Sequence, residues 1–243
     1  MASVYWAFRL LKKCNLVISD NVKRVLKEID ECMAAGVGNS RSITLIGASK
    51  SQTIEKIREA YKAGLRHFGE NYLQEAEEKI INLELNPTWH FIGAIQSRKA
   101  KKISQLFDWV HTVDSYKVAE KLNDSRPSSM NPLNICVQLN IDNEETKSGV
   151  SPDELESFIG ELQYLNNLIV RGLMVIPMQR DDEYEQRKVF KKVKDIYYNL
   201  VNKGYDLDTL SMGMSSDFAA AIKEGATMIR VGTSIFGLRE WTS

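Results

Sequence analysis

The sequence lacks the features that define several common classes of protein. It contains three cysteines, Cys14, Cys32 and Cys136, whose odd number and wide spacing indicate neither a disulfide framework nor a zinc motif. Lys and Arg together number 32, as do Asp and Glu, so no net charge attracts nucleic acid or an anionic membrane. No P-loop and no dinucleotide glycine fingerprint occurs. These absences favour a cytoplasmic protein that binds a small molecule.

The first residues are interpreted as an N-terminal extension, residues 1–18, ahead of a single domain, residues 19–243. The extension carries Arg9, Lys12 and Lys13 and no acidic residue, a bias found in targeting segments. Its apolar runs are short and interrupted by Arg9, so it cannot span a membrane. We expect it either to pack on the domain or to lie upstream of the true start.

Segments with helical and extended patterns alternate along the domain. Val22, Leu26, Ile29 and Met33 have helical spacing and predict an opening helix that ends at Gly36 and Gly38. Eight short apolar runs are typical of strands buried on both faces of a parallel sheet. They are residues 43–48, 66–69, 89–93, 109–113, 134–140, 169–175, 209–212 and 228–231.

Three of the intervening helices have clear boundaries in the sequence. One covers residues 54–62 and is closed by Gly64, one begins at Ser151 and Pro152, and one contains Phe190 to Leu200 and ends at Gly204. Eight strand–helix alternations without a long linker predict one (β/α)8 TIM-type barrel. An open doubly wound sheet has the same local pattern and remains an alternative.

Polar residues follow the predicted strands. In a barrel all strand C-termini open onto one face, where barrel enzymes build their sites. Lys50 follows the first strand, Asn71 the second, and Lys147 lies after the fifth. A lysine at the mouth of an apolar barrel is partly desolvated, which favours the neutral amine that Schiff-base formation needs. A solvated lysine at a strand end is the alternative.

The last two predicted strands offer groups for an anion. Arg230 lies in an otherwise apolar strand, so it must be paired or face the barrel mouth. Gly232 and Thr233 follow it and can offer backbone N–H groups to a phosphate. Ser211 and Ser215 flank the end of the seventh strand, and Ser215 can cap the next helix or bind an anion.

The three histidines, His67, His90 and His111, fall on predicted strands. Their separations of 23 and 21 residues match no local metal-ligand motif, so no metal site is expected. They are predicted to be barrel or interface residues.

Several short sequence motifs occur in the order found in one known family. They are Ala48-Ser49-Lys50, His67-Phe68-Gly69-Glu70-Asn71-Tyr72-Leu73-Gln74-Glu75, Trp89-His90-Phe91-Ile92-Gly93, Lys147-Ser148-Gly149, Arg171-Gly172-Leu173-Met174, Ser211-Met212-Gly213-Met214-Ser215 and Arg230-Val231-Gly232-Thr233. Through these motifs the chain resembles the YggS/PROSC family of pyridoxal phosphate homeostasis proteins, from about Val22 to Arg239. That family is similar to the barrel domain of alanine racemase, a fold-type III pyridoxal phosphate protein.

The resemblance implies pyridoxal 5′-phosphate (PLP) as the cofactor and gives each residue a role. Lys50 would form the internal aldimine, and Asn71 would lie beside the ring. Arg230 would face the pyridine nitrogen, where its permanent charge disfavours protonation and makes the cofactor a poorer electron sink. The phosphate would be held by Ser215, Ser211 and the backbone of Gly232 and Thr233.

The resemblance also favours a carrier over an enzyme. Related racemases take a catalytic tyrosine from an additional β domain, whereas only eleven residues follow Gly232 here. We therefore expect a monomeric carrier or buffer of PLP, without catalytic residues or robust turnover, that serves apo forms of PLP-dependent enzymes. Alternatives are a small racemase or decarboxylase with Lys50 as base, and a cofactor-free aldolase that binds a sugar phosphate at Gly232 and Thr233. Lys147 is a candidate second aldehyde site or relay.

Overall fold

The computed structural model describes residues 17–35, 42–142, 144 and 148–237. Most of the N-terminal extension, the predicted helix end at Gly36 and Gly38, and Lys147 lie outside the described residues. The division between an extension and a domain at residue 18 stays a prediction.

Eight parallel strands close into a barrel in which each strand pairs with its neighbours in sequence and β8 pairs with β1. This confirms the predicted TIM-type barrel over the open sheet. Each of the eight predicted strands overlaps an observed one. They are β1 (Thr44–Ala48), β2 (His67–Glu70), β3 (Thr88–Phe91), β4 (Trp109–Val113), β5 (Leu133–Gln138), β6 (Leu168–Met174), β7 (Thr209–Ser211) and β8 (Met228–Val231).

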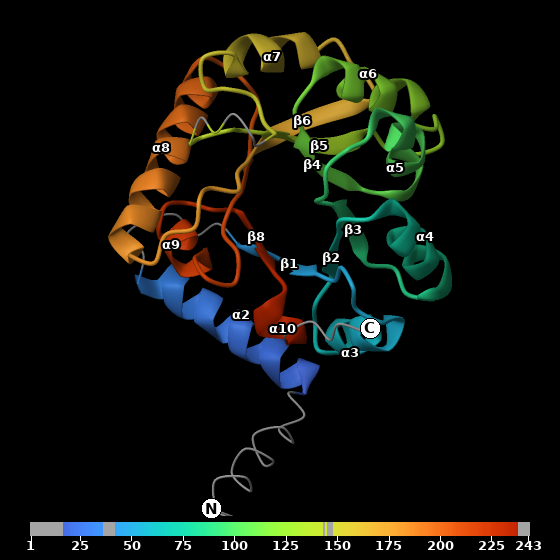
Figure 1. The fold of residues 1–243 in the computed structure, drawn as a ribbon, viewed down its shortest axis with the longest axis vertical. Coiled ribbons are helices and arrows are strands. Elements are labelled where there is room, and N and C mark those ends of the chain that lie inside the picture. The colour runs from blue at the N-terminus through green and yellow to red at the C-terminus, as the bar shows by residue number, and fades with distance from the viewer. Residues whose placement is uncertain (1–16, 36–41, 143, 145–147, 238–243) are drawn as a thin grey trace, which may run out of the picture.

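The helices form an outer ring around the strands (Figure 1). They are α2 (Ile18–Ala35), α3 (Ile54–Lys62), α4 (Leu73–Asn82), α5 (Ala100–Leu106), α6 (Tyr116–Ser125), α7 (Leu155–Leu162), α8 (Glu183–Asn202), α9 (Phe218–Lys223) and α10 (Thr233–Phe236), with a 3₁₀ turn at Ser97–Lys99. Helix α3 ends at the predicted residue because Gly64 follows its cap with a φ of 108°. Among the described residues, none of these helices has the length and hydrophobicity needed to cross a membrane.

The alternation of side chains along each strand produces two buried layers. One layer packs between the strands and the helices and forms the main hydrophobic core. The second fills the barrel interior with a small apolar cluster of Ile46, Trp109, Cys136, Met174 and Met228. Buried polar residues interrupt this second layer, among them His90, His111, Ser211 and Arg230. The barrel interior is therefore partly polar.

Two helix starts differ from the sequence-based expectation. The Ser151 hydroxyl accepts the N–H of Glu154, as a helix cap does, but residues 152–154 form a turn and α7 begins at Leu155. Helix α9 is not capped by Ser215, because its N-cap is Asp217. The Asp217 carboxylate accepts the N–H of Met214 instead, at 2.6 Å, and so closes the preceding turn.

Candidate functional site

Lys50 lies in the tight turn that follows β1, and its side chain is half-buried. The turn begins while the chain is still paired with β2, because the N–H of Ser49 donates to the carbonyl of Gly69 at 2.9 Å. The N–H of Gln52 then returns to the carbonyl of Ser49. Between them, Ser51 has a φ of 60°, a conformation that residues other than glycine seldom adopt. The direction of Lys50 is thus set by a constrained turn.

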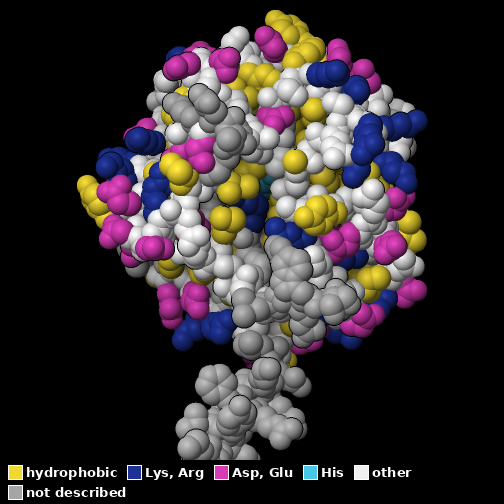
Figure 2. Space-filling view, in the orientation of Figure 1, with side chains coloured by type: hydrophobic (Ala, Val, Ile, Leu, Met, Phe, Trp, Pro, Cys, Tyr) yellow, Lys and Arg dark blue, Asp and Glu magenta, His cyan; other side chains and the backbone are white. Residues whose placement is uncertain are grey.

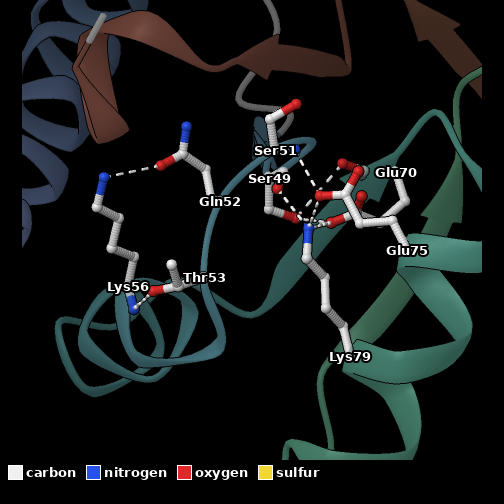
Figure 3. A network of polar contacts seen from close by, with 9 residues as sticks. Ser49, Ser51, Gln52, Thr53, Lys56, Glu70, Glu75 and Lys79 are labelled. Atoms are coloured by element: carbon white, nitrogen blue, oxygen red, sulfur yellow. Dashed lines mark hydrogen bonds and ion pairs between the residues drawn. The ribbon is translucent and has the colours of Figure 1, made fainter. Parts of the chain in front are cut away.

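A buried ammonium group lies beneath this turn (Figure 3). Lys79, on α4, donates to Glu70 Oε1 at 2.8 Å, to Glu75 Oε1 at 2.5 Å and to the carbonyl oxygen of Ser49 at 2.7 Å. Only 5% of the Lys79 side chain and none of that of Glu70 is exposed. We call Ser49, Glu70, Glu75 and Lys79 the Lys79 network. A charge buried this deeply is tolerated only because carboxylates and a carbonyl surround it.

The Lys79 network holds both neighbours of Lys50. The Ser49 hydroxyl donates to Glu70 Oε1 at 2.5 Å, and the N–H of Ser51 donates to Glu75 Oε1 at 2.5 Å. The left-handed conformation of Ser51 is therefore compensated by a hydrogen bond to a charged acceptor. Burial raises the pKa of Glu70, and the Lys79 ammonium opposes that rise. The network fixes the backbone on each side of Lys50.

Arg230 is almost fully buried in the barrel interior. One guanidinium nitrogen donates to both the hydroxyl and the carbonyl oxygen of Ser211, at 2.6 and 2.8 Å. The other donates to the carbonyl of Val175, at the end of β6, at 2.9 Å. Burial lowers the pKa of Arg230 to about 10, so the group is still a cation at neutral pH. The structure thus shows Arg230 held among the ends of three strands.

The exit of β8 approaches the end of β1 closely. In the pairing of the two strands Arg230 lies opposite Ile46, and Val231 lies opposite Gly47. A side chain added at Gly232 would lie 3.4 Å from the carbonyl oxygen of Ala48. Gly232 is also the N-cap of α10, whose first N–H groups have no acceptor within the helix. The glycine brings these donors beside the turn that carries Lys50.

Asn71 follows β2 and lines a cavity of about 350 Å³. Its Oδ1 atom is buried without a hydrogen-bond partner in the described part of the chain. The cavity continues along the ends of β3 to β6, where Asp114, Gln138 and Asn140 contribute to its wall. Lys50 does not line this cavity. The mouth therefore has two neighbouring parts, one with Lys50 and one with a polar cavity.

The structure separates the two serines that were predicted to hold a phosphate. Ser211 is fully buried, and its hydroxyl contacts Arg230 and His111. Ser215 is half-buried in the turn between β7 and α9. A phosphate role for either serine stays a prediction, and that of Ser211 competes with the two contacts that it already makes.

Two clusters were not predicted from the sequence. The sequence contains one local signal of the Lys79 network, because Glu75 and Lys79 lie four residues apart on one face of a helix. The second cluster joins the three histidines inside the barrel, which confirms that they are barrel residues. Their separations of 23 and 21 residues equal about one strand–helix repeat, so the presence of one histidine on each of the consecutive strands β2, β3 and β4 was the available signal. Among the described residues no group of histidine, cysteine and acidic side chains is arranged to hold a metal ion.

Comparison with known proteins identifies the class to which this barrel and its mouth belong. The family model of the alanine racemase N-terminal domain matches residues 24–240, so the chain belongs to that family. Within it, the chain is 43% identical over 227 residues to the pyridoxal phosphate homeostasis protein of Pseudomonas aeruginosa, covering 92% of this chain and 96% of that protein. The Escherichia coli protein of the same name is 40% identical over 229 residues, with coverages of 93% and 98%. The chain is thus a member of the pyridoxal phosphate homeostasis protein family, as its sequence motifs predicted.

Solved structures agree with this membership. PipY of Synechococcus elongatus with PLP bound superimposes with a TM-score of 0.74 at 38% identity, over 86% of this chain and 100% of that chain. Its form without PLP gives a TM-score of 0.77. Alanine racemase of Clostridium difficile shares the fold, with a TM-score of 0.69 at 18% identity, over 92% of this chain and 58% of that chain.

Proposed function

We propose that this protein binds pyridoxal 5′-phosphate covalently through the Lys50 amine and carries or buffers it for PLP homeostasis. The observation that carries the proposal is the position of the Lys50 turn beside the exit of β8, in a chain whose relatives in Pseudomonas aeruginosa and Escherichia coli are named pyridoxal phosphate homeostasis proteins. PipY, a relative whose structure was solved with PLP bound, aligns over 86% of this chain and 100% of its own. PLP supplies an aldehyde that an amine captures reversibly and a ring that can accept negative charge.

Three features of the mouth fit this cofactor. The absence of a side chain at Gly232 leaves room for an anion against the backbone of Gly232 and Thr233, beside the end of β1 from which the Lys50 turn begins. The buried Oδ1 of Asn71 has no partner within the described residues, so it is available to a polar group of a ligand. Arg230 is a cation inside the barrel. In this proposal Ser215, Gly232 and Thr233 hold the phosphate.

The charge of Arg230 favours a carrier over an enzyme. A guanidinium that faces the pyridine nitrogen disfavours its protonation, because two positive charges would then lie in contact. An unprotonated ring withdraws electrons less strongly and stabilises a carbanion less well. Arg230 therefore permits attachment of the cofactor while it disfavours carbanion chemistry.

Absorption of the purified protein tests the attachment. We expect a visible band of the kind given by a PLP–lysine Schiff base, loss of that band in Lys50→Ala, and one Lys50 adduct after borohydride reduction and mass spectrometry. A protein that stays colourless after incubation with PLP would contradict the proposal and favour the cofactor-free aldolase. At excess PLP, a second adduct on Lys147 would support its predicted role as a second site, and its absence would end that hypothesis.

The role as a carrier requires a separate experiment. Loaded protein is mixed with an apo PLP-dependent enzyme in the presence of a scavenger of free aldehyde, and reactivation of the enzyme is measured. We expect reactivation by the loaded protein and none by an equal amount of free PLP. Exchange of the α-proton of amino acids in deuterated water would instead indicate a small racemase or decarboxylase. In this proposal the protein is a cytoplasmic monomer, and sedimentation tests its oligomeric state.

A further inference from the structure

A continuous hydrogen-bonded chain crosses the barrel interior and ends at Arg230. His67 Nδ1 lies 3.0 Å from His90 Nε2, and His90 Nδ1 lies 2.9 Å from His111 Nε2. His111 Nδ1 lies 2.8 Å from the Ser211 hydroxyl oxygen, which accepts from Arg230 at 2.6 Å. We call these five residues the histidine chain. It connects β2, β3, β4, β7 and β8.

The histidine chain runs along the barrel axis, from the start of β2 towards the C-terminal ends of the strands. His67 is the first residue of β2 and is only partly buried, whereas His90 and His111 are completely buried. In the strand pairing His67 lies opposite Thr88, and His90 lies opposite Trp109, so each next histidine is two residues further along its strand. Some histidine surface is visible within the central hollow in Figure 2. The chain thus links the N-terminal end of the barrel with Arg230.

The contacts of Ser211 determine where the protons are. Arg230 can only donate, so the Ser211 oxygen accepts from it. The serine hydroxyl then donates to His111 Nδ1, its other partner. Each neutral imidazole carries one proton, so His111 donates from Nε2 to His90, and His90 donates from Nε2 to His67. In the opposite orientation the buried serine proton would have no acceptor among the contacts that the structure describes.

Burial and charge keep the inner histidines neutral. Burial and the Arg230 guanidinium lower the pKa of His111 to about 3. Burial, together with His111 and His67, lowers the pKa of His90 well below its ordinary value. Since neither ring holds a second proton at neutral pH, the order of donors and acceptors is fixed from Arg230 to His67.

We propose that Ser211 and His111 are positioning residues for Arg230, and that His90 and His67 act by fixing the His111 tautomer. The Ser211 hydroxyl accepts from the guanidinium while its own proton is directed to His111 Nδ1, so the two contacts together hold the hydroxyl in one orientation. Together with the carbonyl oxygens of Ser211 and Val175, the histidine chain therefore sets the plane and rotation of the guanidinium. Its effect on a bound cofactor rests on the proposed PLP site, whereas its effect on Arg230 does not.

Nuclear magnetic resonance of the ring nitrogens in the cofactor-free protein tests the chain itself. We expect His90 and His111 to be neutral at pH 7 with the proton on Nε2. Ser211→Ala removes the donor to His111 and should shift or broaden the His111 Nδ1 signal, whereas Ser211→Thr keeps the hydroxyl and should preserve it. A proton on His111 Nδ1, or a cationic His111 at neutral pH, would overturn the proposal whether or not the protein binds PLP.

The absorption spectrum and release rate of the bound cofactor test the effect of Arg230 positioning. We expect Ser211→Ala and His111→Phe each to shift the visible band and to speed PLP release about fivefold, the change that corresponds to one hydrogen bond. The double variant should match the single ones, because both break the same connection to Arg230. Met174→Leu alters the same interior cluster but removes no hydrogen bond of the histidine chain, so it is the control.

The outcomes are distinguishable. If the wild-type protein forms no adduct with PLP, the proposed function is contradicted. The nuclear magnetic resonance result then still shows whether the histidine chain has the proposed order of donors and acceptors. Equal changes of the visible band and of the PLP release rate in Met174→Leu and His111→Phe would show that the interior residues act only through packing. That result would overturn the positioning role. Additive effects of Ser211→Ala and His111→Phe would do the same. If His111→Phe does not fold, the Ser211→Ala and Ser211→Thr pair gives the same test with a smaller change.

Discussion

At the scale of single residues, Lys79 compensates two carboxylates below the turn of Lys50. Removing one partner of a buried ion pair leaves an uncompensated charge, which costs about 3–5 kcal/mol. We therefore expect Lys79→Met to lower the free energy of unfolding in urea by about that amount. Glu70→Gln/Lys79→Met restores the charge balance and should recover part of the loss. A loss below about 1 kcal/mol in the single variant would show that water reaches the site.

Gly232 provides a second prediction at this scale. An added methyl group would lie 3.4 Å from the carbonyl oxygen of Ala48, which the barrel can accommodate, but it would occupy the space proposed for the phosphate. We expect Gly232→Ala to keep its stability and to bind PLP about tenfold more weakly, a loss of about 1.4 kcal/mol measured by titration. Gly160→Ala on α7, where the nearest atom to the new methyl is the Tyr205 hydroxyl at 3.7 Å, is the control. Unchanged affinity in Gly232→Ala would place the phosphate elsewhere.

At the scale of elements, helix α4 restrains the turn after β1. Glu75 accepts the N–H of Ser51 across the gap between them. Glu75→Ala should expose that N–H to water, so we expect faster amide hydrogen exchange at Ser51 and a loss of about 1 kcal/mol in unfolding free energy. Glu78→Ala, at an exposed position on the same helix, should change neither. Unaltered exchange at Ser51 would show that the turn holds its shape alone.

The same scale shows how much local sequence predicts. Both ends of β4 and of β8 were predicted, because each is a compact apolar run with a sharp boundary. The start of α7 was predicted at Ser151, because that serine makes a cap-like contact with Glu154. The contact closes a turn instead, and the helix begins at Leu155. A local capping pattern specifies a hydrogen bond, but it does not specify whether the chain then continues as a helix.

At the scale of the whole molecule, the closed barrel makes stability depend on pH through its histidines. His111 has an ordinary pKa of 6.5 in the unfolded chain and about 3 in the folded one. Between these values only the unfolded chain binds the proton. The free energy of unfolding should therefore fall by about 1.4 kcal/mol for each unit by which the pH is lowered below 6.5, as the contribution of this residue. His90 acts in the same direction. Urea unfolding of the wild type and of His111→Phe from pH 7 to pH 4 checks this, and equal slopes would contradict it.

Closure also limits what sequence can predict of the site. The lysine, the asparagine and the arginine were each found from their places at or near strand ends. The meeting of Ser211 with His111 joins residues 100 positions apart, and it depends on the register of strands that no local pattern encodes. The Lys79 network likewise depends on how α4 packs against β2 and brings Lys79 to the turn after β1. Long-range register and packing, rather than residue chemistry, are what the sequence left undetermined.

The pairing of β1 with β8 makes the first and last strands of the barrel neighbours. A molecule attached to Lys50 after one of them and bound by Gly232 and Thr233 after the other would link the first and last strands of the barrel. Occupancy would then resist any opening of the ring along this seam. A growing chain that still lacks its last strand could hold such a molecule by only one end, so secure loading would have to wait until the ring is complete.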